Sequence, residues 1–167
     1  MIDPIETKYN GYKFRSRLEA RWAVFFGKMG IKFQYEPEGF KLDSGWYLPD
    51  FWLPQVKMWA EVKRYEFTKR EYCLAYDLSE STGRHCLMLD GDPDFRPYKS
   101  VTVISGIDEK GEVVTDDIDI FYCLVSSYLS EGGFYYFQKP YQGLDLEDYG
   151  NDYKEAVYAA RSERFYE

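Results

Sequence analysis

Residues 48–63 read LPDFWLPQVKMWAEVK and place Asp50 inside one apolar run and Glu61 and Lys63 inside the next. Ionised side chains are rarely buried unless they are paired or bound to a metal ion. The second run alternates in polarity, so Glu61 and Lys63 share one face of an expected strand. An antiparallel connection between the two runs would bring the carboxyl groups of Asp50 and Glu61 together.

Two helices are expected on either side of this stretch. Apolar residues recur at spacings of three and four over 16–29, and Ser16 is a favourable N-cap. Thr68 and Glu71 form a T-x-x-E capping box at the start of a second expected helix over 68–81.

Strand signals lie between and after these helices. The turn Ser44-Gly45 predicts a hairpin, and Pro49 indicates an edge or a bulge in the run that contains it. Strands are expected over 31–35, 40–43, 46–53, 57–65 and 85–91. Four of these strands lie between the two helices, one more than in the expected core order α-β-β-β-α-β.

The second half of the chain gives weaker signals. Two strands over 100–105 and 111–115 could pair through a turn at 107–110. Further expectations are a strand or helix over 119–129, a strand over 132–140, a loop over 141–152 and a helix over 152–165. No boundary stands out, and 92–99 is the best linker candidate. One domain over 1–167 is expected, with its core in 14–91 and an acidic, aromatic-rich extension over 92–167.

Composition excludes several classes of site. The three cysteines are widely spaced and the only histidine is His85. Zinc ribbons, disulfide frameworks and Ser-His-Asp triads are therefore not expected, nor is any zinc or organic cofactor. The first residues lack the apolar segment of a signal peptide, and no apolar run is long enough to span a bilayer. A soluble protein without a membrane partner is expected.

The net charge of −8 is unevenly distributed. Residues 1–83 carry 13 basic and 12 acidic side chains, whereas residues 84–167 carry 8 and 17. The acidic half would repel nucleic acid, so any nucleic-acid-binding function must depend on a local site.

The opening stretch resembles the PD-(D/E)XK nuclease superfamily. Pro49-Asp50 is followed by ten residues and then by Glu61-Val62-Lys63, which is the spacing of that motif. The resemblance covers roughly residues 14–91 and implies an α/β (α+β) fold. Its restriction-endonuclease-like αβββαβ core would have a mixed central sheet flanked by helices, followed here by C-terminal strands and a helix.

The resemblance also implies a role for each residue of the motif. Asp50 and Glu61 would bind Mg²⁺ or Mn²⁺ directly with the Val62 carbonyl, because oxygen ligands match such hard ions. Lys63 would hold or help deprotonate the attacking water and neutralise phosphate charge. Glu19, on the first helix, would complete a second metal position or bind through water. The alternatives are a turn residue for Asp50, a solvated strand face for Glu61 and Lys63, and a capping box with Ser16 for Glu19.

Basic residues near both helices are candidates for nucleic-acid binding, or else ordinary helix-surface pairs. They are Arg15, Arg17, Arg21, Lys69 and Arg70. The expected activity is a Mg²⁺-dependent endonuclease that hydrolyses phosphodiester bonds, with DNA as substrate and a homodimer as a possible state. Such enzymes act in the cytoplasm of bacteria or phage-infected cells.

Two alternatives stay open. A catalytically silent nuclease fold could serve as a protein-binding or DNA-mimic module, for which the acidic half provides the charge. A nuclease directed at RNA would use the same metal chemistry.

Overall fold

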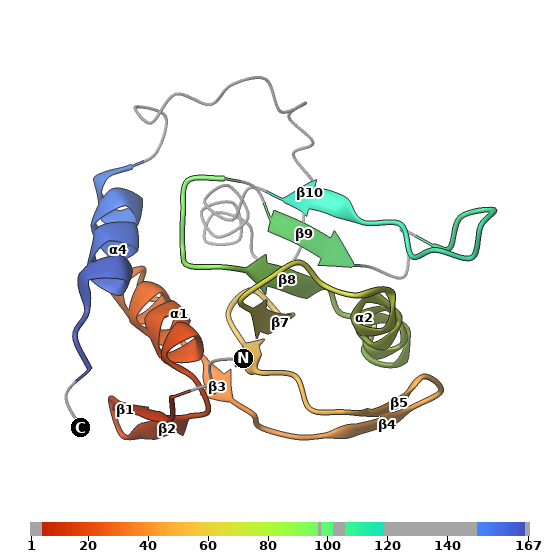
Figure 1. Cartoon of the computed structure of the whole chain (residues 1–167), viewed down its shortest axis with the longest axis horizontal. Coiled ribbons are helices and arrows are strands. Elements are labelled where there is room, and N and C mark those ends of the chain that lie inside the picture. The colour runs from red at the N-terminus through yellow and green to blue at the C-terminus, as the bar shows by residue number, and fades with distance from the viewer. Residues whose placement is uncertain (1–4, 97, 102–105, 119–149, 166–167) are drawn as a thin grey trace.

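The computed structural model describes residues 5–96, 98–101, 106–118 and 150–165. Within them the chain is a mixed α/β protein with three helices around a six-stranded sheet, as Figure 1 shows. This agrees with the expected fold class at the level of a mixed sheet flanked by helices.

The central sheet has the strand order β10-β9-β8-β7-β6-β3. β7 and β8 are parallel and connected through α2, whereas the other neighbouring strands are antiparallel. The charged strand β7 therefore lies inside the sheet, between β6 and β8. The strands are β3 (Gln34–Tyr35), β6 (Phe51–Leu53), β7 (Met58–Lys63), β8 (Cys86–Asp90), β9 (Tyr98–Val101) and β10 (Asp116–Ile118).

Helices α1 (Arg17–Lys28) and α4 (Asn151–Ser162) pack on one face of this sheet, and α2 (Lys69–Thr82) packs on the other. Trp22, Phe25 and Phe26 of α1 are fully buried with Ala60 and Val62 of β7. On the α2 side, apolar side chains of α2 pack with Trp59 of β7 and Cys86 and Met88 of β8. Since side chains alternate along a strand, Glu61 faces α2.

Both predicted helix starts are confirmed. The Ser16 hydroxyl accepts a hydrogen bond from the Glu19 N–H at 3.2 Å, which begins α1. Thr68 and Glu71 form the full capping box of α2. At the other end of α2, Gly83 has φ 65°, a left-handed conformation that closes a helix at no steric cost for glycine.

Two small hairpins extend from the central sheet. The predicted hairpin is present as β4 (Phe40–Leu42) and β5 (Gly45–Tyr47), with its turn at Asp43 and Ser44, one residue before the predicted Ser44-Gly45. Its Ser44 N–H donates to Asp77 of α2 at 2.8 Å, and Figure 1 shows the hairpin reaching toward that helix. The second hairpin, β1 (Thr7–Tyr9) and β2 (Tyr12–Phe14), lies at the end of α1 and is absent from the expected order of elements.

The prediction of one strand over 46–53 is wrong. The structure has two strands, β5 and β6, which belong to different sheets and are separated by Leu48, Pro49 and Asp50. Proline lacks an N–H and holds a fixed φ, so it interrupts a hydrogen-bonded ladder. The break allows the chain to leave the hairpin and enter the central sheet, and Asp50 stands at that entry.

The possible pairing of 100–105 with 111–115 falls mostly on residues outside the described ones. In the described part, β9 pairs with β10 at Asp116–Ile118, and the chain before β10 holds an isolated bridge between Ile107 and Val113. The C-terminal helix is confirmed as α4. The expectations for 102–105, 119–129, 132–140 and most of 141–152 lie outside the described residues. In the described part of the chain, no helix has the length and apolar character needed to cross a bilayer.

Candidate active site

Asp50 and Glu61 lie opposite each other where β6 and β7 meet. The antiparallel register pairs Phe51 with Ala60. Continuing that register by one residue places Asp50 across from Glu61. Both side chains are buried, with 9% and 5% of their surface exposed. The juxtaposition expected from the sequence is therefore present, although the strand that carries Asp50 is shorter than expected.

Asp50 is bound to the backbone of the neighbouring strand. One carboxyl oxygen accepts a hydrogen bond from the Val62 N–H at 2.7 Å. Burial raises the pKa of Asp50 well above its usual range, and the negative charges of Glu61 and Glu19 raise it further. The hydrogen bond from Val62 and the charge of Lys63 oppose this rise without cancelling it. Asp50 is therefore a buried carboxyl group surrounded by other carboxyl groups.

Glu61 has more partners than Asp50. The Tyr47 hydroxyl donates to one of its oxygens at 3.0 Å, and the Asp50 backbone N–H also donates to the carboxyl group. The other oxygen lies 3.1 Å from the Lys63 ammonium nitrogen. Burial raises the pKa of Glu61, and the charge of Lys63 and these hydrogen bonds oppose the rise.

Lys63 lies between two carboxylates. Its ammonium nitrogen is 3.1 Å from Glu61 and 3.7 Å from Glu71, which belongs to the first turn of α2. Burial works against the charged form, but Glu61, Asp50 and Glu71 outweigh it and the pKa of Lys63 is raised. The side chain is 41% exposed, so the cation can reach solvent and a ligand in it.

Glu19 is held by a different set of donors. The Ser16 hydroxyl donates to one of its oxygens at 2.6 Å. The other oxygen accepts from the Tyr35 hydroxyl and, at 3.2 Å, from the Arg15 N–H. Burial raises the pKa of Tyr35, and its hydrogen bond to Glu19 raises it further.

A capping box explains the hydrogen bond from the Glu19 N–H to Ser16, but not the contacts of the Glu19 carboxylate. In α2, Glu71 accepts from the Thr68 N–H at 2.8 Å, as a capping box requires. In α1, the Glu19 carboxylate turns instead to the Tyr35 hydroxyl of β3. The negative charge of Glu19 also raises the pKa of Asp50, although no described hydrogen bond or ion pair joins Glu19 to Asp50, Glu61 or Lys63.

The basic candidates divide into two groups. Arg15 pairs with Glu36 at 3.0 Å, Arg21 with Asp92 at 2.7 Å, and Lys69 with Glu112. These pairs partly neutralise their charges. Arg17 and Arg70 are exposed, and neither has an ion pair with any described residue.

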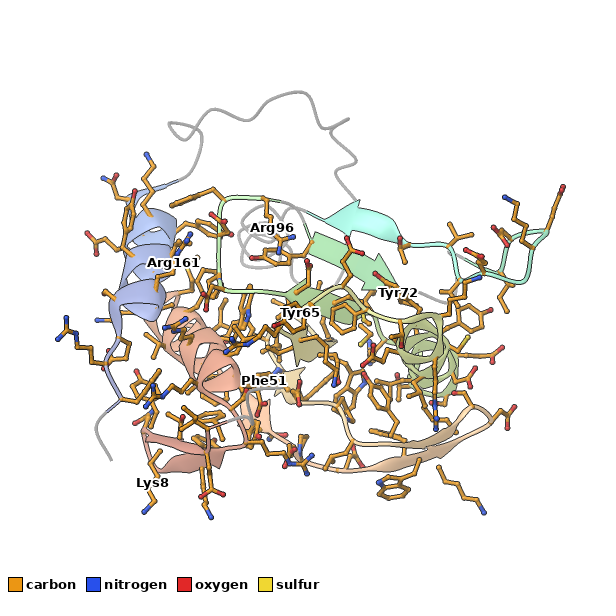
Figure 2. The ribbon with its side chains drawn as sticks, in the orientation of Figure 1. Lys8, Phe51, Tyr65, Tyr72, Arg96 and Arg161 are labelled. Atoms are coloured by element: carbon orange, nitrogen blue, oxygen red, sulfur yellow. The ribbon has the colours of Figure 1, made fainter. Side chains whose placement is uncertain are left out.

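Three residues that contact the predicted site residues were not expected from the sequence: Tyr35, Tyr47 and Glu71. Tyr35 and Tyr47 come from strands remote in sequence from the carboxylates that they bind, so local patterns do not reveal them. The sequence assigned Glu71 to the capping box of α2, and that role gave no indication of its contact with Lys63. Figure 2 labels Phe51, the residue that follows Asp50, among closely packed side chains.

The donor set fits a hard cation that uses water as well as protein ligands. No three of the described His, Cys, Asp and Glu side chains converge into a metal-binding group as they stand. Asp50 and Glu61 would supply two oxygens. A strand residue directs its N–H and C=O to the same side, so the Val62 carbonyl is expected on the side of Asp50. Mg²⁺ usually keeps several waters, so two carboxylates and one carbonyl suffice.

Comparisons with protein-family models, with curated proteins and with solved structures find no match. The interpretation of the site therefore depends on its own chemistry. Within the described residues, the buried Asp, Glu, Lys and Arg side chains are Glu19, Asp50 and Glu61. Asp50 and Glu61 lie opposite each other, whereas Glu19 is bound by Ser16, Arg15 and Tyr35.

Proposed function

We propose that the chain is a metal-dependent nuclease that hydrolyses phosphodiester bonds in DNA. The observation that carries this proposal is the burial of Asp50 opposite Glu61, with the ammonium nitrogen of Lys63 at 3.1 Å from Glu61. Buried carboxylates that repel each other destabilise a fold unless a cation joins them. A structural core has no need of this arrangement, whereas a phosphodiesterase does.

Asp50, Glu61 and the Val62 carbonyl would hold Mg²⁺ or Mn²⁺, and Glu19 would complete a second metal position or bind through water. When bound, the ion supplies Lewis-acid polarisation of the scissile phosphate. The two carboxylates would fix the position of the ion, and their burial limits the access of bulk water to it. These residue types and the mixed sheet support our further proposal that the core is of the restriction-endonuclease type.

Lys63 would act as a cation and as a hydrogen-bond donor. Its pKa is raised by the neighbouring carboxylates, so the ammonium form predominates at neutral pH. It would orient the attacking water and offset negative charge on the phosphate. The oxygen of that water forms a bond to phosphorus and gives up a proton to solvent. The bond from phosphorus to the leaving oxygen breaks, and the leaving oxygen takes up a proton from solvent.

The test is cleavage of plasmid DNA, single-stranded DNA and RNA in Mg²⁺, Mn²⁺ or EDTA. The chain should cleave DNA with either metal and not in EDTA. Asp50→Asn and Lys63→Met should each lose activity, whereas Glu80→Gln and Lys28→Met should retain it, because both control residues are exposed on helices. Cleavage of RNA alone would change the substrate, and metal-independent cleavage or none would refute the proposal.

A further inference from the structure

Residues 64–70 form an exposed basic segment beside the candidate active site, made up of the connection from β7 to α2 and the first two residues of α2. It begins directly after Lys63, and Figure 1 shows it passing in front of β7 and β8. Phe67 is buried and its ring contacts the ring of Tyr72 at 5.9 Å, which fixes the middle of the segment. The other side chains of 64–70 are exposed.

Tyr65 has the most exposed large hydrophobic side chain of the described residues, at 77%. Its ring makes no ring contact and its hydroxyl no hydrogen bond with the rest of the described chain. Figure 2 labels Tyr65 on the side of the molecule toward the viewer, between α1 and α2. An aromatic ring left in solvent beside a buried charged cluster is available to a ligand.

Residues 64–70 contain more basic than acidic side chains, in contrast to the chain as a whole. Arg64, Lys69 and Arg70 belong to the segment, Lys63 precedes it, and Glu66 is its one acidic residue. Lys69 pairs with Glu112, but Arg64 and Arg70 have no ion pair among the described residues. In a chain of net charge −8, this segment is a place where phosphates are attracted.

An exposed ring among basic side chains is the arrangement by which proteins bind single-stranded nucleic acid. The cations track the phosphates and the ring stacks on a base, whichever base it is. In a duplex the faces of the bases are covered by their neighbours, so the ring can stack only on an unpaired base.

The position of Tyr65 relates this contact to the reacting phosphate. Two residues of extended chain span at most about 7 Å, so Tyr65 starts within that distance of Lys63. Stacked nucleotides rise about 3.4 Å each along one strand. The ring therefore reaches a base about two nucleotides from a phosphate bound by Lys63.

We propose that Tyr65 stacks on an unpaired base about two nucleotides from the scissile phosphate while Arg64 and Arg70 bind the flanking phosphates. The substrate is then a single-stranded segment of DNA. The location of the scissile phosphate rests on the nuclease function proposed above, whereas binding of single-stranded DNA does not.

The test is fluorescence anisotropy with a labelled 12-nucleotide single strand and the matching duplex, in EDTA so that no cleavage occurs. The wild type should bind the single strand more tightly. Tyr65→Ala should weaken that binding about tenfold, as expected for loss of one stacked base, and leave duplex binding within twofold. Tyr65→Phe keeps the ring and should bind within twofold of wild type. Tyr158→Ala is the matched control, because Tyr158 is 62% exposed on α4.

Arg64→Ala and Arg70→Ala should each weaken the binding of both single-stranded and duplex DNA. Each should also lower the salt dependence of binding by about one counterion. Equal binding of the two forms by the wild type, no binding of either, or no effect of Tyr65→Ala would overturn the proposal. If Tyr65-dependent binding is present but no metal promotes cleavage, this inference stands and the nuclease function fails. If duplex DNA is cleaved and Tyr65→Ala changes nothing, the reverse holds.

Discussion

The ammonium nitrogen of Lys63 lies 3.1 Å from a carboxyl oxygen of Glu61, on the same face of β7. The two residues are separated by Val62, whose N–H binds Asp50. Three consecutive residues of one strand thus provide a cation, a carboxylate and a backbone contact to a second carboxylate. This relationship underlies the predictions that follow.

Replacement of Lys63 should remove catalysis while leaving the fold intact. Lys63→Met keeps a long side chain and loses the charge that would stabilise the transition state. We expect a decrease of about 10²–10³-fold in the single-turnover cleavage rate at saturating metal. Lys63→Arg retains the charge and should recover part of the rate. A rate within threefold of wild type for Lys63→Met would exclude a catalytic cation at this position.

Replacement of Asp50 should stabilise the protein and inactivate it. Burial and the nearby carboxylates raise the pKa of Asp50 in the folded state. The folded state therefore binds the proton more tightly than the unfolded chain, and this group's contribution to stability falls as pH rises above the ordinary Asp range. Asp50→Asn removes the charge and keeps an oxygen acceptor for Val62. We expect about 1–2 kcal/mol of added stability at pH 7 without metal, measured by urea denaturation.

The gain from Asp50→Asn should shrink as the pH is lowered toward 4, because wild-type Asp50 then becomes neutral. Added Mg²⁺ should raise the melting temperature of the wild type and not that of the variant. A variant less stable than wild type at pH 7, with the same metal response, would show that Asp50 is a structural residue.

Tyr35→Phe should weaken metal binding rather than abolish the reaction. The variant removes the hydroxyl that donates to Glu19 and leaves the ring among its neighbours, 4.6 Å from Phe14 and 5.5 Å from Phe51. Loss of a partner that orients a ligand typically reduces metal affinity 10–100-fold. We expect the Mg²⁺ concentration for half-maximal cleavage to rise by that factor, with the rate at saturating Mg²⁺ within threefold of wild type. An unchanged Mg²⁺ concentration for half-maximal cleavage would show that Glu19 takes no part in metal binding.

Replacement of Glu71 should affect both the stability of the fold and the cleavage rate, whereas replacement of Thr68 should affect stability alone. Glu71→Gln weakens the contact with Lys63, which we expect to lower the cleavage rate about threefold. Thr68→Ala removes the helix cap but keeps the Glu71 side chain, and should reduce stability by about 1 kcal/mol with little change in rate. Equal rates for both variants would restrict Glu71 to capping.

The elements predicted best were those with local signals. The caps at Ser16 and Thr68 defined the starts of α1 and α2, because a side chain three residues from its partner completes each cap. The opposition of Asp50 and Glu61 followed from strand register. The β1–β2 hairpin was missed although its turn, Asn10-Gly11, is a strong hairpin signal with φ 48° and 82°.

Other features of the site depend on contacts between remote segments. Tyr35 and Tyr47 bind Glu19 and Glu61 from strands whose positions follow from the tertiary fold. The break of the 46–53 run at Pro49 was indicated as an edge or bulge, but the separation of β5 and β6 into different sheets was not. The pairing of β9 with β10 was not predicted, because several short segments could have paired with β9.

The most direct test of the metal site is a crystal structure of the wild-type protein soaked in Mn²⁺, with anomalous diffraction recorded. We predict an anomalous peak between the carboxyl groups of Asp50 and Glu61, about 2.0–2.2 Å from an oxygen of each and from the Val62 carbonyl. The same peak should be absent from Asp50→Asn crystals. A structure at high Mn²⁺ concentration with no peak there, and with Asp50 still bound only to the Val62 N–H, would contradict the metal-dependent nuclease.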